Sequence, residues 1–272
     1  MMEHRIVFLS PAGTTAKIAQ KIGQCLEALQ QNVVIADLKQ SHSQQRWSDN
    51  CCLWIGTPVY CDHALPIIET FIANLPKNSN SFSVPFATWG GVTSGTTLFE
   101  MATALEQQGW PSVAAAKFLA VHSCMWQCEH PLGLGHPGND ELALIQELTT
   151  QVVTRLKQAT PELLPTARLD YLSEHLKQDA ATKSLAKAKA SSPPPQADPA
   201  HCTGCGTCIS QCPMNAMTLE ITPQISDACI RCLQCIRFCP QQAFPFDQKA
   251  YETRIRHMQS CSDEEPKSEL FV

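Results

Sequence analysis

Several features that would point to a common class of function are missing from this sequence of 272 residues. No apolar run approaches the roughly 18 residues of a membrane span, which argues against a membrane protein. Lysine and arginine form no long block and the formal net charge is −5, which argues against nucleic acid as a partner. The apolar part of the first nine residues is too short for a signal peptide. These absences together predict a soluble, cytoplasmic protein.

Recognisable catalytic signatures are missing as well. No G-x-G-x-x-G fingerprint of nicotinamide dinucleotide sites follows any predicted strand, and neither a Ser–His–Asp arrangement nor a working pair of carboxylates can be read from the sequence. A core can nevertheless form, because 44% of the residues are hydrophobic and only 17% are charged. The length predicts about two domains.

Cysteine is abundant, with 15 residues, and eight of them form a repeated motif. The run C-x2-C-x2-C-x3-C-P occurs at Cys202–Pro213 and again, 27 residues later, at Cys229–Pro240. This spacing is that of bacterial [4Fe–4S] sites, in which three close cysteines bind one cluster and the fourth, before proline, binds the other. The predicted ligands are Cys202, Cys205, Cys208 and Cys239 for one cluster, and Cys229, Cys232, Cys235 and Cys212 for the second.

Zinc or disulfide bonds are the alternatives for these cysteines. Zinc sites favour paired cysteines that close a tetrahedron, and triplets followed by Cys-Pro fit that pattern poorly. The remaining cysteines are odd in number and lack a secretion signal, which predicts reduced thiols. They are Cys25, Cys51, Cys52, Cys61, Cys124, Cys128 and Cys261.

Residues 5–158 alternate between apolar strands and amphipathic helices. Strands are predicted over residues 5–9, 33–37, 51–55, 84–88 and 117–122, and helices over 16–29, 66–75, 94–108 and 140–158. This alternation predicts a parallel sheet with helices on both faces. Ligands of such sheets bind at the carboxyl ends of the strands, where the loops 10–15, 57–61 and 89–91 would meet. The first loop precedes a helix and is either an anion site or an ordinary capped turn.

The three loops carry a family resemblance. Ser-Pro-Ala-Gly-Thr-Thr at 10–15 resembles the flavodoxin phosphate loop, with Ala12 where threonine is usual. Gly-Thr-Pro-Val-Tyr at 56–60 resembles the second flavin loop, and Trp-Gly-Gly at 89–91 stands where the third belongs. The resemblance implies FMN. Its implied binding residues are Ser10, Ala12, Gly13, Thr14 and Thr15 for the phosphate, and Thr57, Pro58, Val59, Tyr60, Trp89, Gly90 and Gly91 for the ring.

The chain as a whole resembles the flavodoxin–ferredoxin fusion proteins of anaerobes. The resemblance implies a flavodoxin-like, doubly wound α/β domain with a five-stranded parallel sheet in the order 2-1-3-4-5, followed by a small α+β two-cluster ferredoxin domain. The predicted boundaries are 1–158 for the FMN domain, 159–199 for a helical and proline-rich linker, 200–247 for the ferredoxin domain, and 248–272 for a C-terminal helix and acidic tail. The linker is expected to hold one helix over 167–190, and the tail after Cys261 is expected to be frayed.

Some residues near the implied flavin site have two interpretations. One of the rings of Tyr60 and Trp89 stacks on the flavin, or else either ring serves only for packing. Cys61 and His63 either contact the ring or belong to a structural loop. The side chains of His122, Cys124, Cys128, His130 and His136 form either a metal site or a loop beside the flavin edge.

The expected function is electron transfer between the two clusters and FMN, with redox partner proteins at the ends. The alternative is a flavin-dependent reductase of a small molecule, with the clusters as its internal wire, so whether the chain is an enzyme stays open. A flavin-free docking module is a third possibility. Arg231 and Arg237 would make the second cluster easier to reduce if they point towards it.

Overall fold

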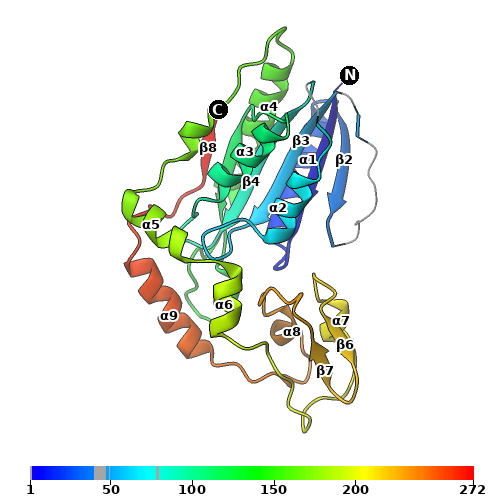
Figure 1. Cartoon of the computed structure of the whole chain (residues 1–272), viewed down its shortest axis with the longest axis vertical. Helices are drawn as coiled ribbons and strands as arrows, with labels where there is room; N and C mark the ends of the chain where they lie inside the picture. Colours follow the sequence, from blue (N-terminus) through cyan, green and yellow to red (C-terminus); the bar gives the residue numbers. More distant parts are fainter. Residues whose placement is uncertain (1, 40–46, 49, 78–79) are drawn as a thin grey trace.

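The larger part of the molecule is a sheet with helices on both faces (Figure 1). The computed structural model describes residues 2–39, 47–48, 50–77 and 80–272. The sheet has the order β2-β1-β3-β4-β5-β8, and its strands are β1 (Glu3–Phe8), β2 (Asn32–Asp37), β3 (Cys51–Pro58), β4 (Phe82–Trp89), β5 (Ala115–Leu119) and β8 (Glu269–Phe271). The covering helices are α1 (Thr14–Ala28), α2 (Pro66–Ala73), α3 (Thr97–Gln107) and α4 (Asn139–Leu156).

Side chains that alternate along β1 and the residue after it belong to two separate hydrophobic cores. Ile6 and Phe8 pack with α1 and α4 on one face, whereas Val7 and Leu9 pack with α2 and α3 on the other. Successive side chains of a strand point to opposite faces, so a strand buried on both sides is apolar throughout. The predicted parallel order 2-1-3-4-5 is confirmed by the register of these five strands.

The C-terminal tail completes the sheet, so the expectation of a frayed tail is wrong. β8 pairs with β5 in the antiparallel direction, with Ala115 opposite Phe271. Upstream of β8, the carboxylate of Glu264 accepts hydrogen bonds from Lys117 Nζ at 2.8 Å and from the Ser94 N–H at 2.7 Å. The sequence after Cys261 is acidic and polar, and it gives no local sign that Glu264 would form a buried ion pair with Lys117.

The same contact corrects the predicted start of a helix. A helix is predicted over 94–108, with Ser94 as a typical capping residue at its start, but the N–H and hydroxyl of Ser94 both bind Glu264. Helix α3 therefore begins later, at Thr97.

The linker also differs from its prediction. Instead of one helix over 167–190 it forms three short ones: η2 (Thr166–Leu169), α5 (Glu174–Thr182) and α6 (Leu185–Ser191). Ser173 and Ser184 begin α5 and α6, since each hydroxyl accepts a hydrogen bond from the N–H three residues ahead. Serine is among the preferred residues at the N-terminal cap of a helix, because its hydroxyl binds a free backbone N–H. A serine within a helical pattern can therefore start a new helix and divide the pattern in two.

The cysteine-rich region lies beyond the carboxyl ends of the parallel strands (Figure 1). It consists of α7 (Thr207–Ser210), the hairpin of β6 (Met217–Leu219) and β7 (Pro223–Ile225), and α8 (Gln234–Arg237). Lys39, just after β2, donates from Nζ to the Ser210 carbonyl at 3.0 Å. The chain enters this region from α6 and returns through α9 (Gln248–Ser260) to β8. In the described part of the chain, no helix has the length and apolar character needed to cross a membrane.

Candidate functional site

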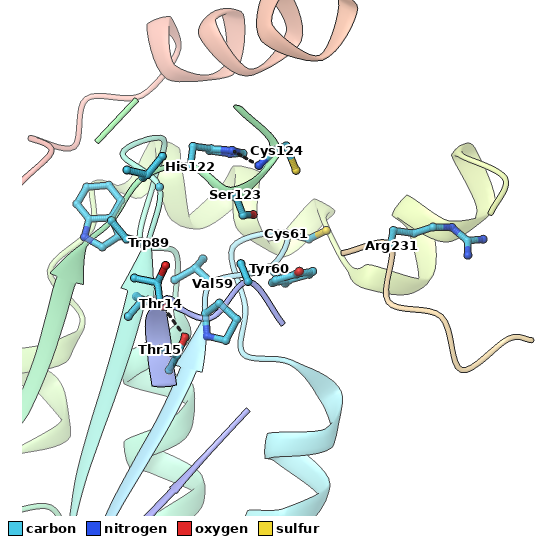
Figure 2. A pocket seen from close by; sticks show the side chains of 16 residues that line it. Thr14, Thr15, Val59, Tyr60, Cys61, Trp89, His122, Ser123, Cys124 and Arg231 are labelled. Carbon is cyan, nitrogen blue, oxygen red and sulfur yellow. Dashed lines mark hydrogen bonds between the residues drawn. The ribbon is translucent and has the colours of Figure 1, made fainter. Parts of the chain in front are cut away.

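The loops after β1, β3, β4 and β5 surround a pocket of about 190 Å³ (Figure 2). We call it the flavin pocket, after the cofactor implied by the sequence. The residues that line it are Ala12, Thr14, Thr15, Pro58, Val59, Tyr60, Cys61, Thr88, Trp89, Gly90, Ala120, Val121, His122, Ser123, Cys124 and Arg231. The three loops singled out in the sequence are thus brought together at one edge of the sheet.

The loop before α1 fits an anionic group. Gly13 has φ of +88°, and no atom lies within 4 Å of where its Cβ would stand. Among the described residues none accepts a hydrogen bond from the N–H of Thr14 or Thr15. Free N–H groups at the start of a 15-residue helix, together with the helix dipole, form a phosphate-binding site. The loop therefore fits the phosphate of FMN.

Two of the hydroxyls in this loop have protein partners. Ser10 Oγ accepts a hydrogen bond from the Ala16 N–H at 2.9 Å, and the hydroxyls of Thr15 and Thr88 lie 2.8 Å apart. Ser10 only accepts in this contact, so its own proton can still be donated to an anion. The N–H groups of Thr14 and Thr15 can donate as well, and they do not depend on the side chain at position 12, so Ala12 is compatible with an anion site.

The loop after β3 contains a tight turn. Tyr60 and His63 exchange two backbone hydrogen bonds of 2.9 and 3.0 Å, and the residues between them, Cys61 and Asp62, have φ of 50° and 70°. Left-handed conformations at two consecutive non-glycine residues are unfavourable and need support from their surroundings.

Contacts on both sides supply that support. Lys183 Nζ lies 2.7 Å from the Asp62 carboxylate. A Cβ on Gly95 would stand 1.9 Å from the Asp62 carbonyl oxygen, so only glycine allows this approach. The turn is therefore held in a fixed position beside the flavin pocket.

His63 ties this turn to α5 instead of lining the pocket. Its Nδ1 lies 2.9 Å from Glu100 Oε1, and its Nε2 lies 3.0 Å from the Ala180 carbonyl oxygen. The hydrogen bond to Glu100 raises the pKa of His63 to about 9. Of the pair Cys61 and His63, only Cys61 faces the flavin pocket.

Tyr60 and Trp89 both line the pocket, but they differ in exposure. Trp89 is 2% exposed and lies in the core, where its ring faces Lys117 Nζ at 5.5 Å. Tyr60 is partly exposed and lies on the opposite side of the pocket from Trp89 (Figure 2). Tyr60 is thus the better candidate for contact with a flat ring.

Four of the implied flavin residues lie outside the pocket lining. These are Ser10, Gly13, Thr57 and Gly91. Ser10 and Gly13 shape the start of α1, as described above. Thr57 is fully buried and its hydroxyl donates to the Pro58 carbonyl, whereas Gly91 faces Leu119, Leu132 and Pro266.

The segment after β5 contributes a wall of the pocket that the sequence left ambiguous. His122 and Cys124 line the pocket, while His136 binds Glu141 at 2.9 Å and Cys128 accepts from Gln248. Burial lowers the pKa of His122 to about 4 and raises that of Cys124 to about 11. His122 is therefore neutral at physiological pH, and the five side chains do not converge on one point.

Arg231 is the lining residue least visible from the sequence, since it belongs to the cysteine-rich region (Figure 2). Its Nε donates to the Ser192 carbonyl at 3.1 Å. Arg237 is exposed and lies over the Phe238 ring at 5.6 Å. Only the packing of the two parts of the chain brings Arg231 to the flavin pocket.

The eight repeated cysteines separate into two sets of four. The first cysteine site is the cavity lined by Cys202, Cys205, Cys208 and Cys239. The second cysteine site is the cavity lined by Cys212, Cys229, Cys232 and Cys235. Each Cys-Pro cysteine therefore lies with the triplet of the other motif.

The internal repeat extends to hydrogen bonds. The Ala216 N–H donates to Cys212 Sγ at 3.3 Å, and the Ala243 N–H donates to Cys239 Sγ at the same distance. Such N–H···S contacts stabilise thiolates that bind a cluster. The four-sulfur cavities fit a cubane, whose ligands stand around a body of metal and sulfide.

A single metal ion needs a different arrangement. In the described ranges of the chain, no group of three or more His, Cys, Asp or Glu side chains is placed to hold one ion. Four cysteines around a cavity are nevertheless what a cubane requires, because its corners are separated.

The second cysteine site adjoins the flavin pocket. Arg231 lines both cavities. Tyr60, Cys232 and Met214 all pack against the apolar cluster that includes Ile230. None of the residues that line the first cysteine site lines the flavin pocket.

Comparison with known proteins agrees with this division. Residues 5–120 match the family model of a flavodoxin domain, and residues 194–240 match that of a 4Fe-4S dicluster domain. No curated protein matches the chain.

Solved structures similar to this chain include flavodoxins. A flavodoxin from the domain Archaea is 17% identical, with a TM-score of 0.42, over 58% of this chain and 100% of that one. Flavodoxin 1 from Bacillus cereus is 12% identical, with a TM-score of 0.45, over 56% and 97%. Rubredoxin oxygen:oxidoreductase from Desulfovibrio gigas is 17% identical, with a TM-score of 0.44, over 57% of this chain but only 36% of that one.

The two domain matches support FMN and an iron–sulfur cluster as cofactors. They follow each other in the order of the fusion proteins that the sequence resembles. The chain therefore contains a flavodoxin domain followed by a 4Fe-4S dicluster domain, an arrangement that is consistent with a flavodoxin–ferredoxin fusion and supports an electron-transfer flavo-iron–sulfur protein.

Proposed function

We propose that this protein passes single electrons between two [4Fe–4S] clusters and FMN, with the second cysteine site next to the flavin. A cluster exchanges one electron at a time, whereas a flavin takes one or two together with protons. Joining them in one chain would connect one-electron and two-electron chemistry.

One observation carries the order of the sites. Arg231 stands between the cysteines Cys229 and Cys232 of the second site and also lines the flavin pocket. Tyr60 and Cys232 pack against the same group of buried apolar side chains, which includes Ile230. This packing supports a direct path for electrons between the two cavities. The first cysteine site shares no described lining residue with the flavin pocket, which supports its role as the entry or exit point for electrons.

Exposure supports a partner at the first cysteine site. Cys205 is exposed, whereas no cysteine of the second site is. Leu219 lines the first cavity and is 43% exposed. We therefore propose that an external redox protein contacts the molecule on this side.

The chain's own residues would hold FMN as follows. The N–H groups of Thr14 and Thr15 would bind the phosphate, while Val59, Tyr60 and Gly90 would flank the ring. The neutral His122 and the protonated Cys124 would keep that wall of the pocket uncharged.

Anaerobic purification with iron, sulfide and flavin measured together tests this proposal. Two four-iron clusters and one flavin predict about eight iron atoms and about one FMN per chain. Electron paramagnetic resonance during stepwise reduction should then resolve two cluster signals. About four iron atoms, or iron without flavin, would contradict the proposed inventory.

A flavin-dependent reductase is the second candidate, and a second cavity favours it. A pocket of about 610 Å³ lies beside the flavin pocket and shares Val59, Cys61, Gly90 and His122 with it. Its size is that of a small-molecule site. A reductase should show saturable reoxidation of its flavin by a small molecule, whereas a carrier should reduce dyes slowly and without selectivity.

A further inference from the structure

The pocket of about 610 Å³ is built from parts of the chain that are far apart in sequence. The turn after β3 and the loops after β4 and β5 form one side. The other side is the α5–α6 junction, with Lys183 and Lys187, and α9, with Arg254, His257 and Met258. We call it the side pocket. It exists only because the segments before and after the cysteine-rich region both return to the sheet.

The charges around the side pocket do not cancel. Among the described residues, Asp62 is the one carboxylate that lines the pocket, and Lys183 pairs with it at 2.7 Å and also with Asp179. Lys187 Nζ donates to the neutral Thr182 carbonyl at 2.7 Å. No described residue forms a hydrogen bond or ion pair with the Arg254 guanidinium. Two cations, Lys187 and Arg254, therefore remain uncompensated.

Apolar side chains complete the lining. Val59, Val92, Ala188 and Met258 face the same cavity. Small-molecule sites combine apolar walls with a few charged groups that fix orientation.

We propose that the side pocket binds a small organic carboxylate with an apolar body, placed by Lys187 and Arg254 next to the flavin pocket. The planar guanidinium of Arg254 suits a carboxylate, which it can bind through two parallel hydrogen bonds. The apolar body would lie against Val92 and Met258, towards the wall shared with the flavin pocket. This ligand class deepens the second candidate function, a reductase, and rests on it.

Calorimetric titration with cinnamate tests the proposal, with cinnamamide as its uncharged counterpart. The titrations use anaerobic protein with its cofactors, and the same protein after flavin removal. Cinnamate should bind to both forms and more tightly than cinnamamide. Because exposed charges are screened, its affinity should fall as ionic strength rises. In the flavin-containing form, binding should also perturb the visible absorption of the flavin.

Variants locate the site. Arg254→Gln and Lys187→Gln should each weaken cinnamate binding about fivefold, the size expected for one exposed cation. Arg256→Gln and Lys189→Gln are the matched controls, because they remove the same charge from α9 and α6 without lining the pocket. Both controls should bind cinnamate as the wild type does.

Several outcomes would overturn the inference. Equal affinity for cinnamamide, no binding of cinnamate, or equal effects of the control and pocket variants would each refute a carboxylate site here. Binding only to flavin-free protein would mean that the flavin itself fills the side pocket. Failure of the proposed function can be distinguished from failure of this inference. If the purified protein never contained flavin, the proposed function would fail, but cinnamate binding to the same protein could still be measured.

Discussion

The two cysteine sites have the same motif and yet occupy different surroundings. The first has an exposed cysteine, Cys205, and lies away from the flavin pocket. The second has no exposed cysteine and shares Arg231 with that pocket. The repeat supplies two equivalent sets of four cysteines, and packing against the sheet makes their surroundings unequal. Variants that affect one site or the other can test what this inequality does.

Removal of one cysteine from each site should give the largest difference. We expect Cys232→Ser to slow flavin reduction by an external one-electron donor at least about 100-fold, since the second site is proposed to adjoin the flavin. Cys205→Ser should remove the other cluster signal selectively and slow flavin reduction less. Stopped-flow absorption and electron paramagnetic resonance measure the two effects. If both signals persisted in Cys205→Ser, the ligand assignment would be wrong.

Loosening the C-terminal tail should destabilise the sheet, to which the tail is bound through Glu264 and β8. Lys117 and Glu264 are 3% and 7% exposed in their side chains. Breaking a buried ion pair typically costs roughly 3–5 kcal/mol, and we expect about 3 kcal/mol for Glu264→Gln because Glu269 stays near Lys117. The thermal midpoint should fall, and protease should cleave the tail sooner.

Glu265→Gln is the matched control for this variant. Glu265 is the next residue, and its one ion pair within the described part of the chain is with the exposed Lys267, so its loss should change little. Equal midpoints for the two variants would show that the tail does not depend on the Glu264 contact.

The pH dependence of the free energy of unfolding should report on the turn from Tyr60 to His63, which lies beside the flavin pocket. Glu100 raises the pKa of His63 from 6.5 to about 9, so the folded state favours the charged form. Its contribution is fully present below pH 6.5 and is lost as the pH rises towards 9. We expect on the order of 1–2 kcal/mol, because the pair is partly exposed.

Thermal midpoints of the wild type and of His63→Asn measure this contribution. The difference between them should be large at pH 6 and small at pH 9.5. A difference that stays constant over this range would mean that His63 acts only through packing.

The smallest expected effect concerns the potential of the second cluster. Removing a nearby cation makes a cluster harder to reduce, and we expect Arg231→Gln to lower its potential by about 30 mV, equivalent to about threefold in the reduction equilibrium. Arg237→Gln should change it less, because Arg237 is exposed and lies over Phe238. A potentiometric titration followed by electron paramagnetic resonance compares the two. A larger shift in Arg237→Gln than in Arg231→Gln would contradict a special role of Arg231 beside the second cluster.

Much of the site could be predicted because it depends on local sequence. Loops such as 10–15 follow a strand and precede a helix, so their meeting at one edge of a parallel sheet follows from topology. Helix α9 also begins at Gln248, within the predicted C-terminal segment 248–272, and the side chain of Asp247 caps it by accepting a hydrogen bond from the Ala250 N–H. Where local signals competed, prediction failed: Ser184 divided an apparently continuous helix, and Ser94 bound Glu264 instead of capping α3.

The sequence by itself determined the parallel sheet, the loops at its carboxyl edge and the two cysteine motifs, since each is specified by residues near one another in the chain. Only the tertiary structure decided which motif adjoins the flavin pocket, where the tail ends and that a side pocket exists. Arg231 donates to the Ser192 carbonyl, 39 residues earlier, and Glu264 accepts from Ser94 and Lys117, 170 and 147 residues earlier. Arg254 lines the side pocket together with the loops after β3, β4 and β5. The local pattern of apolar and polar residues cannot predict such contacts, because they depend on how the chain returns to the sheet after the cysteine-rich region.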